Sequence, residues 1–134
     1  MLGSIYADNY RRLKELGILD AMSAEHSTHF KAPGFMDLVI EAIGEYTRDG
    51  KAYPLLSIAH YYEQNGDLCP DPEMEILLNH EFGYCEAMTM SATYGYFEVY
   101  PGENLVNLRN KKELNAFLGQ WLKNIKDQGH KKVD

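Results

Sequence analysis

Residues 49–64, DGKAYPLLSIAHYYEQ, decide the fold class of this chain. The Asp-Gly pair at the start supplies the positive φ angles that a tight two-residue hairpin turn needs. In the residues that follow, side chains alternate between the two faces of an extended chain. One face would carry Leu56, Ile58, His60 and Tyr62, and the other Leu55, Ser57, Ala59, Tyr61 and Glu63. The stretch therefore predicts a hairpin whose returning strand covers residues 52–64.

The strand on the other side of this turn is less clear from its pattern. Residues 35–43, FMDLVIEAI, are compatible with a buried helix or with a strand, and the ambiguity extends to residue 46. We interpret residues 35–43 as a strand, because apolar residues recur at every second position and the β-branched Val39 and Ile40 favour extended backbone.

Three further strands are predicted at residues 73–78, 85–91 and 94–100. Asn65-Gly66-Asp67 is expected to end the second strand, and Pro70 and Pro72 are expected to keep their loop out of the sheet. The connections between the strands are too short for parallel crossovers. The sequence thus predicts an antiparallel β-meander of about five strands within residues 33–101.

Two helices are expected on either side of the meander. Residues 4–16 carry apolar side chains at spacings of three and four, with Ser4 as N-cap and Gly17 at the end. Residues 110–129 form the clearer helix, which has a capping box at Asn110 and Glu113 and a stop at Gly129. Its apolar stripe, which we expect to pack on the sheet, contains Leu114, Phe117, Leu118, Trp121, Leu122 and Ile125.

The predicted fold class is α+β, with residues 1–134 as a single domain. Residues 1–32 would contribute a helix and a loop, residues 33–101 the antiparallel sheet, and residues 110–129 the C-terminal helix. Residues 20–33 show no periodicity and are expected to form a loop in which His26 and His29 are solvated. The tail after Gly129 is expected to be mobile.

Charge is distributed unevenly along the chain, whose net charge is -7. Residues 33–110 contain thirteen acidic and three basic side chains, whereas residues 111–134 contain six lysines and three acids. An acidic surface repels a phosphate backbone, so we expect no direct binding of nucleic acid and a protein partner with a basic surface. The plainer alternative is that the acids only keep a small domain soluble.

The sequence also indicates the cellular compartment of the protein. No apolar run approaches the ~20 residues that a membrane helix needs, and the first ten residues lack the layout of a signal peptide. Cys69 and Cys85 are too few for a disulfide framework. We therefore expect a cytoplasmic protein that does not interact with a membrane and is a monomer or a homodimer, since a meander leaves sheet edges that can pair.

The segment richest in possible function is residues 60–75, HYYEQNGDLCPDPEME. Its acids could surround a hard cation, although their spacing does not fit a known calcium loop. No known catalytic motif is present, so we assign no catalytic residue, no metal ligand and no cofactor. As candidate partner-binding residues we take Tyr61, Tyr62, Glu63, Asn65, Asp67, Asp71, Glu73 and Glu75.

Three segments carry a resemblance to a known family: residues 57–76 (SIAHYYEQNGDLCPDPEMEI), residues 97–101 (FEVYP) and residues 112–129 (KELNAFLGQWLKNIKDQG). They resemble small bacterial proteins grouped as domain of unknown function 6908, which are common on plasmids, phages and conjugative elements. The C-terminal helix and strand order are also similar to domain of unknown function 1249. The resemblance spans roughly residues 33–129 and leaves out the first 32 residues. It implies a shared fold and a mobile-element context, and it carries over no catalytic residues.

The expected function is a non-enzymatic protein-binding module of a plasmid, phage or conjugative element. A narrower version is an inhibitor of host defence, of the anti-CRISPR type, that acts on a basic surface. The alternative is a small metal-dependent hydrolase that uses the acids of residues 63–75.

Overall fold

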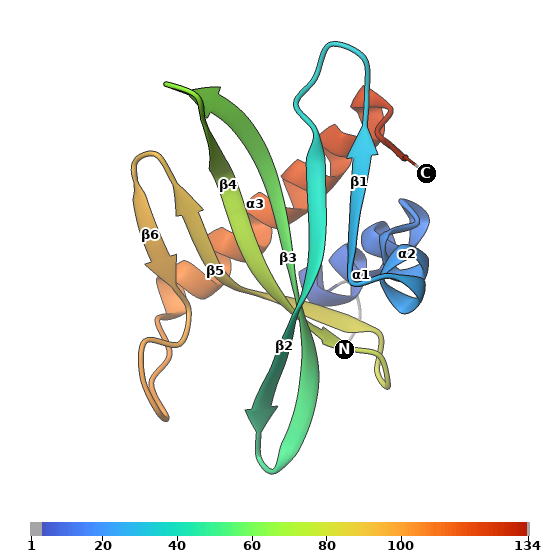
Figure 1. The fold of residues 1–134 in the computed structure, drawn as a ribbon. Helices are drawn as coiled ribbons and strands as arrows, with labels where there is room; N and C mark the ends of the chain where they lie inside the picture. The colour runs from blue at the N-terminus through green and yellow to red at the C-terminus, as the bar shows by residue number, and fades with distance from the viewer. Residues whose placement is uncertain (1–3, 134) are drawn as a thin grey trace.

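The computed structural model describes residues 4–133, and in this range seven strands form one antiparallel sheet in the order β6-β5-β4-β3-β2-β1-β7 (Figure 1). Five consecutive strands make the predicted meander: β2 (Leu38–Arg48), β3 (Lys51–Gln64), β4 (Asp67–Asn79), β5 (Tyr84–Ala92) and β6 (Gly95–Glu98). Residues 38–48 are therefore strand, and the predicted α+β class with an antiparallel sheet is confirmed.

The two long hairpins are closed by the turn residues that the sequence supplies. Asp49 and Gly50 have φ values of 52° and 78° between β2 and β3. Asn65 and Gly66 have φ values of 55° and 85° between β3 and β4. Positive φ at both central residues matches the right-handed twist of the flanking strands, so each hairpin has a two-residue turn.

The expectation that Pro70 and Pro72 stay outside the sheet is wrong. β4 begins at Asp67, and Pro70 pairs with Tyr61 of β3. Between this pair and the pair Ala59 with Glu73, β4 has one residue more than β3. Such a bulge interrupts the ladder of hydrogen bonds, which is where residues without an N–H are tolerated.

Two more strands lie where a loop and a mobile tail were predicted. Residues 20–33 contain the end of α2 (Ile18–Ala24) and the whole of β1 (Ser27–Lys31), which pairs with β2. In β1 only Thr28 and Phe30 are buried, so the strand has too few apolar residues to be recognised. The tail forms β7 (Lys131–Lys132), which pairs with β1 and so is not free. His26 and His29 are exposed, as predicted.

The helices lie on one face of the sheet, where α3 passes behind the strands as viewed in Figure 1. Ser4 caps α1 (Ile5–Glu15) through a bond from the Ala7 N–H. The start predicted for the last helix is wrong: α3 (Leu108–Gln128) is capped by Asn107, whose side chain accepts from the Asn110 N–H. Its end at Gly129, with φ 83°, is confirmed.

The hydrophobic core fills the space between this face and the helices. Its largest fully buried side chains come from α1, α2, α3 and strands β1 to β4, and they are Phe30, Leu13, Ile18, Leu38, Ile40, Leu56, Ile58, Met74, Ile76, Leu118 and Leu122. The side of β3 predicted to carry Leu56, Ile58 and His60 faces this core. Within residues 4–133 no helix is long and apolar enough to cross a membrane.

Candidate functional site

The other face of the sheet is left uncovered by the helices and points toward the viewer in Figure 1. Strand register places five residues of this face in one line across the sheet: Glu41, Ser57, Glu75, Thr89 and Glu98. We call this line the acidic row. Carboxylates stand on β2, β4 and β6, and hydroxyls on β3 and β5. Because neighbouring strands lie ~4.8 Å apart, the backbones of successive glutamates in the row are about 10 Å apart.

A second line runs beside the acidic row and adds one more acid and an aromatic ring. It consists of Val39, Ala59, Glu73, Ser91 and Tyr96. The hydroxyl of Ser57 donates a hydrogen bond of 3.3 Å to Glu73, which links the two lines. Tyr61 follows Ala59 by two positions and therefore lies on the same face.

The carboxylates of this face contribute to the pKa values of its two tyrosines. Partial burial raises the pKa of Tyr61, and the charges of Glu73 and Glu41 raise it further. Partial burial likewise raises the pKa of Tyr96, with added contributions from Glu98 and Glu75. Both phenols thus remain protonated hydrogen-bond donors beside anionic acceptors.

Within the described part of the chain, the acids of this face form no ion pair with a basic side chain. Ion pairs among residues 4–133 involve other carboxylates, and none includes Glu41, Glu73, Glu75 or Glu98. Over residues 38–98 the chain carries eleven acidic side chains, with Arg48 and Lys51 as the basic ones. Glu41, Glu73, Glu75 and Glu98 therefore place negative charge on the uncovered face without an ion pair among the described residues.

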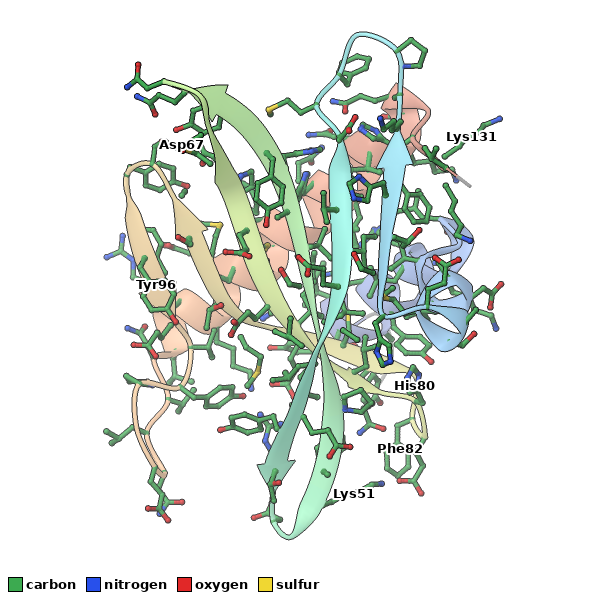
Figure 2. The ribbon with its side chains drawn as sticks, in the orientation of Figure 1. Lys51, Asp67, His80, Phe82, Tyr96 and Lys131 are labelled. Atoms are coloured by element: carbon green, nitrogen blue, oxygen red, sulfur yellow. The ribbon has the colours of Figure 1, made fainter. Side chains whose placement is uncertain are left out.

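The structure divides the predicted partner-binding residues among several places. Tyr61, Glu73 and Glu75 meet on the uncovered face. Tyr62 points to the opposite side of β3, and its hydroxyl donates to Gln64 over 3.2 Å. Asn65 and Asp67 stand at the exposed end of the β3–β4 hairpin, where Figure 2 labels Asp67.

Two of the predicted residues do not contribute a described side chain to this face. Asp71 accepts a hydrogen bond of 3.2 Å from the Thr93 N–H, and so it ties β4 to the β5–β6 turn. The side chain of Glu63 lies outside the described part of the structure.

Sequence reasoning left three members of the face out of the candidate set: Glu41, Tyr96 and Glu98. Each is separated from Glu75 by at least 21 residues of chain, and only strand register brings them together. The alternation within each strand was available as a signal, but it gives the face of a residue and not its neighbours across the sheet.

A second polar cluster connects the β2–β3 hairpin to the chain before α3. Arg48 bonds Glu86 at 2.6 Å, the Tyr100 hydroxyl donates to Glu86 at 2.7 Å, and Lys111 donates to Tyr100 at 3.3 Å. Burial and the bond to Glu86 raise the pKa of Tyr100 to about 12. Beside this cluster, Tyr46, Tyr100 and residues 102–106 line a cavity of about 470 Å³. The charged groups of the cluster satisfy one another, so they act as a structural link.

Glu63 and Glu75 lie too far apart to act as the paired acids of a glycosidase. Glu63 lies six positions along β3 from Ser57, the partner of Glu75, so the two backbones are roughly 20 Å apart. A glycosidase pair needs carboxyl groups about 5–10 Å apart. Among the described residues, no three His, Cys, Asp or Glu side chains gather in a way that could hold a metal ion.

Comparison with known proteins bears on the family. A family model described as "Domain of unknown function (DUF6908)" matches residues 9–131. The match begins inside α1, so the resemblance was wrong to leave out the first 32 residues. No curated protein and no solved structure matches the chain. Because the family model covers most of the sequence, this protein belongs to the family of domain of unknown function 6908.

Proposed function

We propose that the uncovered face of the sheet is a binding surface for a partner protein with a basic surface, and that the protein acts by binding and not by catalysis. The observation that carries the proposal is the acidic row, in which Glu41, Glu75 and Glu98 are aligned without a described cation beside them. Aligning like charges costs free energy in the free protein. A basic partner would remove that cost and gain affinity from it.

Two properties of the face support a protein partner over a nucleic acid. The negative charge repels phosphates. Tyr61 and Tyr96 offer rings with a polar tip, and tyrosine is enriched in protein interfaces. Ser57 and Ala59 on the same face are buried, so the tyrosines and the glutamates around them form the surface that a partner would contact.

The narrower proposal is that the partner belongs to a host defence system and that this protein, carried by a mobile element, blocks a basic nucleic-acid channel. Its support is the charge of the face, which resembles that of a nucleic acid, together with the mobile-element context implied by the family resemblance. Binding to such a channel would compete with the nucleic acid that normally occupies it.

The test compares two triple variants in a capture experiment from a lysate of the native host. The first is Glu41→Gln, Glu75→Gln and Glu98→Gln on the uncovered face. The matched control is Glu15→Gln, Glu113→Gln and Asp127→Asn, which removes the same charge from exposed positions on the helices. We expect the first variant to lose the partners that the unmodified protein and the control capture.

Salt provides an independent readout, because a charge-driven complex weakens as ionic strength rises. Captured partners should elute between low and moderate salt. Partners that stay bound to the first triple variant, or that resist elution by salt, would count against the proposal.

The alternative function, a metal-dependent hydrolase that uses acids of residues 63–75, gains no support from the described side chains. It is tested by thermal melts with and without calcium, magnesium, manganese and zinc. A metal that binds only the folded state must raise the melting temperature as its concentration increases.

A further inference from the structure

One edge of the sheet is paired with the C-terminal residues, whereas the other edge is open in the described chain. At one edge the C-terminal residues cover β1: Lys131 and Lys132 pair with it, and the Val133 N–H donates to the His29 carbonyl over 2.9 Å. At the other edge no strand of the described chain lies beyond β6. Figure 2 shows Lys131 near the first edge and Tyr96 on β6 at the second.

The backbone of β6 presents hydrogen-bonding groups to this open edge. The β5–β6 hairpin has two turn residues between the pair Ala92 and Gly95, and such a closing pair exchanges both of its bonds across the hairpin. Because bonded and non-bonded pairs alternate, the polar groups of Tyr96 and Glu98 point away from β5. A bond of 2.9 Å from the Asn110 side chain to the Glu98 carbonyl agrees with this direction.

The side chains along the same edge are suited to a partner strand. Tyr94 and Tyr96 are 70% and 59% exposed, and they rank among the most exposed large apolar residues of the described chain. Glu98 belongs to the acidic row, which therefore reaches the edge strand. A strand added beyond β6 would place one side chain next to Glu98 and another, two positions away, next to Tyr96.

We propose that β6 accepts an extended segment of the basic partner as an additional strand of the sheet, with a lysine or arginine of that segment beside Glu98. This inference rests on the proposed function and names how the partner reaches the face. The added strand would be short, because Asn110 already occupies the Glu98 carbonyl and residues 99–107 lead away toward α3. Pairing is limited to about four residues of β6.

Charge decides against a second copy of this chain as the occupant. Two antiparallel copies of β6 would join one acidic face to another and bring their glutamates onto one continuous surface. Each molecule carries a net charge of -7. A basic segment gains attraction at the position where a second copy meets repulsion.

The first experiment uses defined peptides and the unmodified protein. One peptide of eight residues alternates lysine and threonine, and a second has the same sequence with every backbone amide N-methylated, so that neither of its edges can donate a hydrogen bond to β6. We expect only the first peptide to bind at low ionic strength with slower hydrogen exchange of the Tyr96 and Glu98 amides, by about tenfold at saturation.

Each outcome decides a different question. Equal binding of both peptides, without slower exchange at β6, would overturn strand addition and leave the charged face as the binding surface. Absence of binding by either peptide would overturn the strand proposal, whereas the capture experiment with triple variants decides the proposed function separately. Exchange that slows with protein concentration alone, together with a dimer in sedimentation, would identify a second copy and also overturn it.

The second experiment separates the backbone of the edge from its side chains. Tyr96→Ala keeps the outward N–H, whereas Tyr96→Pro removes it at an edge position where proline is compatible with a sheet. We expect Tyr96→Pro to bind the unmethylated peptide at least about tenfold more weakly than Tyr96→Ala. Equal affinities in two variants with similar melting temperatures would contradict the proposal, and if Tyr96→Pro does not fold, the exchange experiment decides.

Discussion

At the scale of single residues, Glu86 is the carboxylate that the structure holds most firmly. Its side chain is 17% exposed, and it accepts bonds from Arg48 and Tyr100. Burial by itself would raise the pKa of Glu86, but these two bonds and the nearby cations outweigh burial and lower it. The ionised form is therefore the one that stabilises the fold.

We predict that Glu86→Gln lowers the free energy of unfolding by about 2 kcal/mol at pH 7. A carboxyl with a lowered pKa in the folded state contributes stability above its ordinary pKa and loses it as pH falls through the folded value. The difference between the variant and the unmodified protein should thus shrink in acid. Urea unfolding at pH 7 and at pH 3 measures it, and a constant difference would contradict the prediction.

His60 differs from Glu86, because its surroundings favour the neutral form of the side chain. It is buried, its Nδ1 lies 3.0 Å from the Asp37 carbonyl, and its ring packs edge-on against Trp121. Burial lowers the pKa of His60, and the neighbouring His130 lowers it further, although the Asp37 carbonyl opposes the shift. The folded protein therefore favours the neutral ring.

We predict that stability falls as pH drops below about 6.5, because the unfolded chain then binds a proton that folded His60 resists. His60→Phe should unfold more easily at pH 7.5 but lose less stability between pH 7.5 and pH 5. Exposed His26 provides the control, and His26→Gln should retain the pH dependence of the unmodified protein. An unchanged pH dependence in His60→Phe would contradict this assignment.

At the scale of elements, the contact between α1 and α3 depends on a glycine. A Cβ on Gly119 would lie 3.0 Å from the Asn9 Oδ1 and 3.2 Å from the Ile5 Cδ1. Asn9 is fully buried and donates to the Asn115 carbonyl over 3.0 Å, so it has little freedom to move. The absence of a side chain at Gly119 is what lets the two helices approach.

We predict that Gly119→Ala destabilises the protein by about 1–3 kcal/mol, although alanine favours helix by about 1 kcal/mol over glycine. The exposed neighbour serves as control, and Gln120→Ala should change stability by less than about 0.5 kcal/mol. Thermal melts of both variants provide the measurement. A stabilised Gly119→Ala would show that helix propensity outweighs the close contact.

At the scale of the whole molecule, charge is separated between the sheet and the helices. Residues 38–98 carry eleven acids and two basic side chains, whereas α3 carries five basic and two acidic ones. The acidic row places like charges at regular intervals on one face, and a row kept for binding reduces the stability of the free protein.

We predict that the triple variant Glu41→Gln, Glu75→Gln and Glu98→Gln melts a few degrees higher than the unmodified protein at low salt. The gain should disappear at about 1 M salt, where the Debye length falls to ~3 Å. The helix variant Glu15→Gln, Glu113→Gln and Asp127→Asn should show no gain, because Glu15 and Glu113 each face an arginine. A lower melting temperature of the first variant at low salt would contradict the prediction that repulsion within the acidic row destabilises the free protein.

Local patterns in the sequence determined most of the fold. Period-two alternation identified β2, β3 and residues 73–78 of β4, and the Asp49-Gly50 pair set the register of the first hairpin. Ser4 and Gly129 marked helix ends, because their backbone requirements are local. The family of domain of unknown function 6908 was also recognisable from the sequence.

Tertiary structure alone decided the features that depend on long-range pairing. β1 pairs with β2 on one side and with β7 on the other, and the residues of β1 and β7 carry almost no alternation of apolar and polar side chains. The prolines of β4 are accommodated by a bulge that only the partner strand defines. The acidic row likewise comes from five strands in register. A sequence specifies the face of each side chain through local geometry, but neighbours across a sheet are specified only when the whole sheet forms.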